Sequence, residues 1–125
     1  MAVYNGHLLD FLNKDRNGEK LFCDVIINVG REKFYGHRFL LDIASGYFRR
    51  MFRSFLIERY TNEVTIFGPH DDELTADTME RIFQYIYTRE IDITKNNVYD
   101  ILFAADYLDI KKLKYICLDF LLDIK

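Results

Sequence analysis

Apolar residues in this 125-residue chain recur at helical spacing over most of its length. The first stripe predicts an amphipathic helix, and its members are Tyr4, Leu8, Phe11 and Leu12. The polar segment 13–20 contains Gly18 and predicts a loop. The chain therefore begins with a helix that has one apolar side.

The pattern then changes to short strands. Residues 24–29 and 32–35 flank Gly30-Arg31, a two-residue hairpin signal. The first of these strands contains the run VII, which is too apolar for an exposed edge. We therefore expect that strand to be buried on both faces.

Helical spacing returns after Gly36. A wide stripe predicts a helix, and its members are Ala44, Tyr47, Phe48, Met51, Phe52 and Phe55. The Ser45 hydroxyl is placed to cap the start of this helix. A short strand is expected at residues 63–67, ended by Gly68-Pro69.

The remainder predicts three helices, each with an apolar stripe at helical spacing. The stripes are Met79, Ile82, Phe83, Ile86 and Tyr87 in the first, Val98, Ile101, Leu102 and Ala105 in the second, and Leu113, Ile116, Cys117, Phe120, Leu121 and Ile124 in the third. Asp77 and Glu80 have capping-box spacing at the start of one, and Thr94 is placed to cap the next. Between them, residues 89–93 alternate and predict a brief strand. The second helix carries a row formed by Tyr99, Phe103 and Tyr107, which suits either a core or a partner surface; we expect Phe103 in the core.

The order helix, hairpin, two helices, strand and further helices predicts an α+β fold, a small sheet capped by helical hairpins. Residues 1–125 are expected to form a single domain with a core of its own.

Composition excludes several classes of function. A net charge of -3 argues against a nucleic-acid binder, and the cluster Arg49, Arg50 and Arg53 is typical of a solvated face. No apolar run is long enough for a membrane span, and the N-terminus lacks the features of a signal peptide. Cys23 and Cys117 predict reduced thiols, and so a location in the cytoplasm or the nucleus.

The sequence does not indicate a catalytic site or a metal site. His7, His37 and His70 are spread out, and none lies at ligand spacing from a cysteine. The acidic run 71–73 is typical of a solvated loop. We therefore expect no enzyme activity, no metal, no cofactor and no small-molecule substrate.

Several separated blocks resemble the signature of the BTB (POZ) domain family. They are Cys23-Asp24-Val25, His37-Arg38, Leu41, Ser45, Tyr47-Phe48, Met51-Phe52, Ile86-Tyr87-Thr88, Asn97-Val98 and Ala104-Ala105-Asp106-Tyr107-Leu108. The resemblance extends over nearly the whole chain. It is strongest to the BTB domains of BTB–kelch proteins, and the phrase HRFLL-x-x-AS-x-YF is similar to the poxviral branch.

This resemblance implies a homodimeric protein-interaction module, usually the N-terminal part of a longer protein. The dimer residues it implies are Tyr4, Leu8, Phe11, Asp24, His37 and Arg38. Asp24 beside Arg38 would pair a charge at the interface. Alternatively, Asp24 only opens a strand and Arg38 extends to solvent. We interpret His37 as a satisfied core or capping histidine rather than a catalytic one. Phe39 and Ile43 stand where many relatives carry small residues.

The resemblance also implies an adaptor that binds cullin-3 in a ubiquitin ligase. The family's adaptor motif, a hydrophobic residue, any residue and then glutamate, falls just after the aromatic helix. The cullin-facing residues it implies are Leu56, Ile57, Glu58, Tyr60, Asn62 and Tyr107. Alternatively, Leu56 only completes the helix stripe. A second function is also open, an assembly module that recruits repressor or signalling partners without a cullin.

Overall fold

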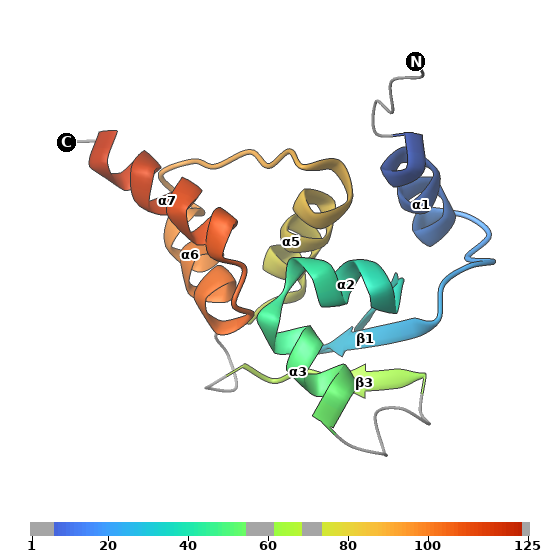
Figure 1. The fold of residues 1–125 in the computed structure, drawn as a ribbon. Coiled ribbons are helices and arrows are strands. Elements are labelled where there is room, and N and C mark those ends of the chain that lie inside the picture. The colour runs from blue at the N-terminus through green and yellow to red at the C-terminus, as the bar shows by residue number, and fades with distance from the viewer. Residues whose placement is uncertain (1–6, 55–61, 69–73, 124–125) are drawn as a thin grey trace.

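A small sheet and the helices around it make up the part of the chain that the computed structural model describes, residues 7–54, 62–68 and 74–123 (Figure 1). The elements in chain order are α1 (His7–Asn17), β1 (Val25–Val29), β2 (Glu32–Gly36), α2 (Arg38–Ala44), α3 (Gly46–Ser54), β3 (Glu63–Thr65), α5 (Ala76–Thr88), α6 (Val98–Tyr107) and α7 (Lys111–Asp123). Figure 1 shows α5 in the middle, with α1 on one side and the α6–α7 pair on the other. This is the predicted α+β architecture. No described helix has the length and apolar character needed to cross a membrane.

The predicted hairpin around Gly30 is confirmed. Gly30 has a φ of 61°, which a glycine adopts without steric cost. β1 and β2 pair antiparallel, with Val25 opposite Gly36, and β3 joins the other side of β1 in parallel. The strand order is therefore β2-β1-β3, with β1 in the centre.

Burial along β1 alternates. Three side chains on one face are at most 1% exposed, namely Val25, Ile27 and Val29. Ile26 and Asn28 on the other face are only half-buried. The prediction that both faces of this strand are buried is therefore right for one face only. The described elements cover the other face only in part.

Ser45 separates α2 from α3 and caps α3, as predicted. Its backbone is extended, with φ −136° and ψ 122°. Its hydroxyl accepts a hydrogen bond from the Phe48 N–H at 3.1 Å and donates one to the Leu108 carbonyl at 2.6 Å. One buried side chain thus starts α3 and ties it to the end of α6.

The apolar stripe of α5 is confirmed, but its predicted cap is wrong. Thr75 is the N-cap residue, since its hydroxyl accepts from the Thr78 N–H at 3.2 Å. Asp77 already lies inside the first helical turn, so it cannot form a capping box with Glu80. The buried stripe consists of Met79, Ile82, Phe83, Ile86 and Tyr87, each at most 1% exposed.

The predicted strand at residues 89–93 is absent from the described structure. Arg89 ends α5 in the left-handed conformation, with φ 64°, and the chain continues irregularly to α6. Ile91 and Ile93 pack against the core from this irregular backbone, which accounts for the alternation in the sequence.

The α6–α7 pair supplies much of the remaining core. Thr94 caps the turn before α6, because its hydroxyl accepts from the Asn97 N–H at 3.2 Å and Asn97 accepts from the Thr94 N–H at 2.8 Å. Phe103 is only half-buried and lines a surface groove with Tyr99 and Leu118, so its predicted place in the core is wrong. The completely buried residues of the pair are Val98, Ile101, Ala104, Ala105, Leu113 and Cys117.

Helix α1 continues through Asn17, into the segment predicted as a loop. Arg16 explains the extension. Its guanidinium lies 4.9 Å from the centre of the Tyr87 ring, its Nε donates to Asn13 at 2.8 Å, and a bridge of 3.6 Å joins it to Glu80. In the polar last turn of α1, Arg16 is therefore buried against α5, whereas Lys14 and Asn17 are exposed.

Candidate functional site

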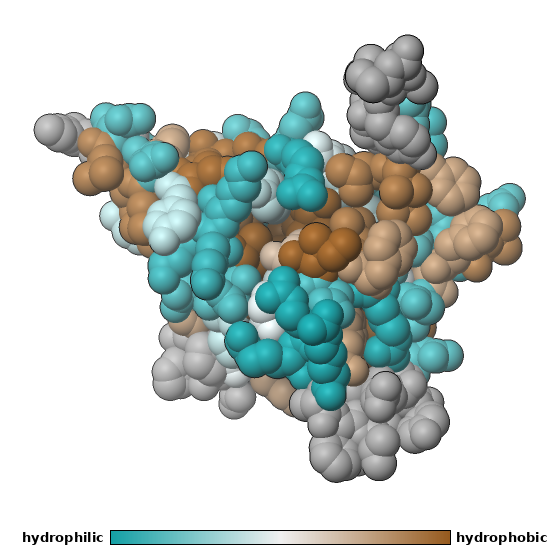
Figure 2. Space-filling view, viewed as in Figure 1, coloured by the Kyte–Doolittle hydropathy of each residue, from teal (hydrophilic) through white to brown (hydrophobic). Residues whose placement is uncertain are grey.

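Apolar side chains are exposed on α1, on α2 and on the loop before β1. Figure 2 shows them on the face of the molecule turned to the viewer. We call Leu8, Phe11, Phe22, Phe39 and Ile43 the α1–α2 apolar face; they are 48%, 51%, 60%, 52% and 65% exposed. The Phe11 and Phe22 rings lie 5.5 Å apart. An apolar surface of this kind is typical of a protein-interaction site.

Asp24 and Arg38 lie together, as the sequence suggested. The Arg38 backbone N–H donates to Asp24 Oδ1 at 2.7 Å, and Arg38 Nε donates to the Asp24 carbonyl at 3.4 Å. The Asp24 carboxylate thus stabilises the N-terminus of α2. The Arg38 guanidinium also lies 4.9 Å from the centre of the Phe52 ring.

His37 is not a surface residue. It is 1% exposed, so its side chain supports the surface from inside and cannot touch a partner. Leu8 and Phe11 are on the α1–α2 apolar face, and Tyr4 lies outside the described residues.

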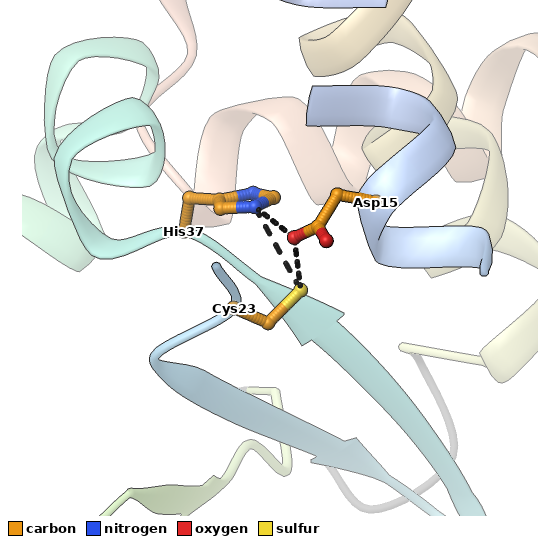
Figure 3. A group of neighbouring side chains, drawn as sticks. All are labelled: Asp15, Cys23 and His37. Carbon is orange, nitrogen blue, oxygen red and sulfur yellow. Dashed lines mark hydrogen bonds and ion pairs between the residues drawn. The ribbon is translucent and has the colours of Figure 1, made fainter. Parts of the chain in front are cut away.

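Beneath this face three polar side chains converge from different segments (Figure 3). Asp15 comes from the last turn of α1, Cys23 from the loop before β1, and His37 from the start of α2. His37 Nε2 lies 2.9 Å from Asp15 Oδ2, and Cys23 Sγ lies 3.6 Å from the same oxygen and 3.8 Å from Nε2. We call these three residues the Asp15–Cys23–His37 cluster.

Backbone amides fix the Asp15 carboxylate. Oδ1 accepts from the Leu21 N–H at 2.8 Å, and Oδ2 accepts from the Phe22 N–H at 3.0 Å. Burial by itself would raise the pKa of Asp15, but the hydrogen bonds from His37, Phe22, Cys23 and Leu21 together hold this pKa below its ordinary value.

Tyr87 of α5 holds the other side of the imidazole. Its hydroxyl accepts from the His37 backbone N–H at 3.0 Å and lies 2.7 Å from Nδ1. A neutral His37 with its proton on Nε2 satisfies both neighbours, since Nε2 donates to Asp15 and Nδ1 accepts from the hydroxyl. Burial, the largest cause, raises the pKa of Tyr87, so this hydroxyl stays protonated.

The cluster does not resemble an activated cysteine nucleophile. Burial and the neighbouring Asp15 carboxylate raise the pKa of Cys23 to about 11. The thiol is therefore protonated at neutral pH, whereas a nucleophilic cysteine needs a lowered pKa. The geometry supports hydrogen bonding or ligation rather than covalent catalysis.

The predicted cullin-facing residues fall partly outside the described chain, which does not include Leu56, Ile57, Glu58 and Tyr60. Asn62 lies immediately before β3, where its carbonyl accepts from the Ile26 N–H at 2.6 Å. Tyr107 of α6 is half-buried, and its ring lies 5.1 Å from that of Tyr47 on α3.

A cavity of about 300 Å³ lies between α2, α5 and the start of α7. Ile43 of the α1–α2 apolar face lines it. Four of its lining residues are basic and one is acidic: Arg49, Arg89, Lys111, Lys112 and Asp109. Its charge suits an acidic segment of a partner.

Sequence reasoning missed the role of Asp15, Cys23 and Tyr87. His37 is 14 residues from Cys23 and 50 from Tyr87, so no local motif contains them. The predicted hairpin could have shown that Cys23 lies near His37. Continuing its register beyond Val25 and Gly36 places the Cys23-Asp24 pair beside His37-Arg38.

Comparison with known proteins agrees with this fold. The family model described as the BTB/POZ domain matches residues 12–125. Zinc finger and BTB domain-containing protein 7A of Gallus gallus is 34% identical over 118 residues, which cover 94% of this chain and 20% of that protein. Kelch-like protein 40 of Xenopus laevis is 34% identical over 121 residues, which cover 97% and 19%. The chain thus spans about a fifth of the length of these curated relatives.

Solved structures match over nearly the whole chain. The BTB domain of zebrafish PATZ1 has a TM-score of 0.79 and 25% identity, and the match covers 97% of this chain and 98% of that one. The BTB domain of human Gigaxonin has a TM-score of 0.76 and 25% identity, covering 96% of each chain.

Proposed function

This chain belongs to the BTB/POZ family of protein-interaction modules, and from that premise we propose that it is a homodimerising adaptor domain that binds the N-terminal region of cullin-3 in a ubiquitin ligase. The observation that carries the proposal is the α1–α2 apolar face. Phe39 and Ile43 extend it beyond the residues expected from the family, at 52% and 65% exposure. Burial of such side chains against a second copy would supply the main favourable contribution to association, since removing apolar surface from water drives most protein–protein binding.

The proposed dimer interface comprises Tyr4, Leu8, Phe11, Asp24 and Arg38, with His37 supporting them from inside. Light scattering tests it. We expect the wild type to have about twice the chain mass of 15.0 kDa, and Phe11→Glu to have that of one chain. Tyr115→Glu is the matched control, because Tyr115 is 63% exposed on α7, away from this face. A wild type that is monomeric at micromolar concentration contradicts the proposed dimer.

The proposed cullin surface is Leu56, Ile57, Glu58 and Tyr60, with Asn62 and Tyr107. Two observations support it. The motif directly follows α3, and the contact with Tyr47 places Tyr107 beside α3. A leucine buried in a partner pocket contributes about 1.5–3 kcal/mol.

Calorimetric titration with the N-terminal domain of cullin-3 tests this surface. We expect wild-type binding with one cullin domain per chain, and loss of binding for Leu56→Ala and for Glu58→Ala. Leu118→Ala on α7 is the control, since its side chain is 37% exposed and lies outside the proposed surface. Binding retained by both motif variants rules the assignment out.

One observation favours the second function, recruitment of repressor or signalling partners without a cullin. The basic cavity beside Ile43 adjoins the α1–α2 apolar face and suits an acidic peptide. A folded dimer that does not bind cullin-3, but binds an acidic peptide that Lys111→Glu releases, would establish this function instead. Two further predictions are that the protein is located in the cytoplasm or the nucleus and that it is similar to the poxviral branch of the family.

A further inference from the structure

The Asp15–Cys23–His37 cluster presents the three donor types found in protein zinc sites. A thiol sulfur, an imidazole nitrogen and a carboxylate oxygen point to one spot from α1, the loop before β1 and the start of α2 (Figure 3). The three donor atoms all lie within 4.8 Å of one another. Residues so far apart in sequence meet here only because the chain folds.

The separations fit one cation. With ordinary zinc bond lengths and tetrahedral angles, a thiolate sulfur lies about 3.6 Å from the other donors, and nitrogen lies about 3.4 Å from oxygen. The observed distances from Cys23 Sγ are 3.6 Å to Asp15 Oδ2 and 3.8 Å to His37 Nε2. The nitrogen and oxygen lie 2.9 Å apart, because a hydrogen bond joins them, so a cation must widen only this pair, by about 0.5 Å.

Neighbouring groups hold the donors in place. The Leu21 and Phe22 amides fix the Asp15 carboxylate, at 2.8 and 3.0 Å. The Tyr87 hydroxyl stands 2.7 Å from the second nitrogen of His37. In metal sites the other N–H of a ligating histidine is usually donated to a carboxylate, a backbone carbonyl or water, which fixes the ring, and here the Tyr87 oxygen occupies the place of that acceptor.

We propose that Asp15 Oδ2, Cys23 Sγ and His37 Nε2 bind one divalent transition-metal ion of the zinc type, with water as a fourth ligand. Cys23 is partly exposed and gives access, whereas His37 and Asp15 are 1% and 8% exposed. On binding, the thiol releases its proton to solvent. The His37 proton moves from Nε2 to Nδ1, and Nδ1–H then donates a hydrogen bond to the Tyr87 oxygen while the hydroxyl hydrogen of Tyr87 turns away from the ring. Two anionic ligands then balance the charge of the cation at a largely buried position.

Such an ion would link α1 to the loop before β1 and to the start of α2. Because it would bind the folded chain and not the unfolded one, it would raise the melting temperature. It lies beneath the α1–α2 apolar face without forming part of it, so the site does not depend on the proposed dimer or on cullin binding.

Cobalt(II) is the probe, because a thiolate ligand gives it a near-ultraviolet charge-transfer band. We expect this band in the wild type, its loss in Cys23→Ser, and its retention in Cys117→Ser, which removes the other described cysteine. Circular dichroism of Cys23→Ser establishes that the variant is folded. No band in the folded wild type, or a band that survives Cys23→Ser, overturns the proposal.

Zinc gives a second readout. Added zinc should raise the melting temperature of the wild type and of Cys117→Ser. It should not change the melting temperature of Cys23→Ser or of Asp15→Asn. An equal shift in all four proteins would show binding elsewhere and would overturn the assignment. His7→Ala controls for the exposed histidine of α1 and should behave like the wild type.

Discussion

The two sides of α5 are held by different forces. On one side α6 and α7 pack through apolar side chains, among them Ile101 and Leu113, which are 0% exposed. On the other side α1 places Leu12 in the core, but its last turn is held by oriented hydrogen bonds and ring contacts, at what we call the α1 corner. In the described part of the chain, three of the five buried polar or charged side chains lie at this corner, and they are Asp15, Arg16 and His37.

This difference suggests a division of roles. Apolar packing stabilises without much dependence on direction, whereas hydrogen bonds fix orientation. Helix α1 carries Leu8 and Phe11 of the α1–α2 apolar face, so the geometry of that face depends on the polar corner. We therefore expect substitutions in the apolar side to cost the most stability.

The largest effect is expected from Ile101→Ala. The side chain is completely buried in α6, and its removal leaves a cavity that should lower the free energy of unfolding by about 2–5 kcal/mol. Denaturant unfolding measures the change. Tyr99→Ala, on the same helix and 67% exposed, is the control and should stay within about 0.5 kcal/mol of the wild type. An equal loss in both variants would contradict the assigned packing.

A smaller loss is expected from Tyr87→Phe at the α1 corner. The substitution keeps the ring but removes the hydroxyl that accepts from the His37 backbone N–H. A buried donor left without a partner costs about 1–3 kcal/mol, measured again by denaturant unfolding. Tyr99→Phe removes an exposed hydroxyl and should have no measurable effect. If the two variants unfold alike, the corner does not depend on this bond.

The apolar side is also the one that the sequence predicted well. Periodicity identified the stripe of α5 and most of α6 and α7, because each of these helices buries one continuous row of side chains. The errors there have local causes. The strand expected at residues 89–93 does not begin at Arg89, because this residue is in the left-handed conformation at the end of α5. Thr75, and not Asp77, is the N-cap of that helix. Phe103 lies at the border of the buried row, where spacing does not decide exposure.

The α1 corner was predicted poorly. Hydrophobic periodicity identifies the apolar faces of helices. It does not predict the burial of a charged residue such as Arg16, whose guanidinium lies over the Tyr87 ring. The Asp15–Cys23–His37 cluster depends on contacts between segments that are separate in sequence. The hairpin register could have placed Cys23 beside His37, but no spacing in the chain places Asp15 next to them. Resemblance to the family selected Asp24, His37 and Arg38, and the 1% exposure of His37 agrees with its interpretation as a core or capping histidine.

Ser45→Ala tests whether a polar contact also orients elements on the apolar side. The substitution removes the cap of α3 and the hydrogen bond to the Leu108 carbonyl. Loss of a serine cap costs about 1 kcal/mol, which a shift in the denaturant midpoint measures. Ser45→Thr keeps the hydroxyl and serves as the matched variant. A Ser45→Ala protein as stable as the wild type would confine oriented polar contacts to the α1 corner.

The smallest change is confined to acid and concerns Asp15. Its pKa in the folded state is below the ordinary 3.8, so the unfolded chain binds more protons in this range and stability rises with pH. The contribution of Asp15 is complete above about pH 5 and is lost as the pH falls through its folded pKa. Urea unfolding of wild type and Asp15→Asn between pH 5 and pH 2 should therefore give two curves that converge towards acid. The control Leu118→Ala changes no ionisable group, so its curve should run parallel to that of the wild type. If the Asp15→Asn curve instead stays parallel to the wild-type curve, the charge of the Asp15 carboxylate does not hold α1 in place. The α1 corner would then be stabilised by packing of its rings, just as the other side of α5 is stabilised by apolar packing.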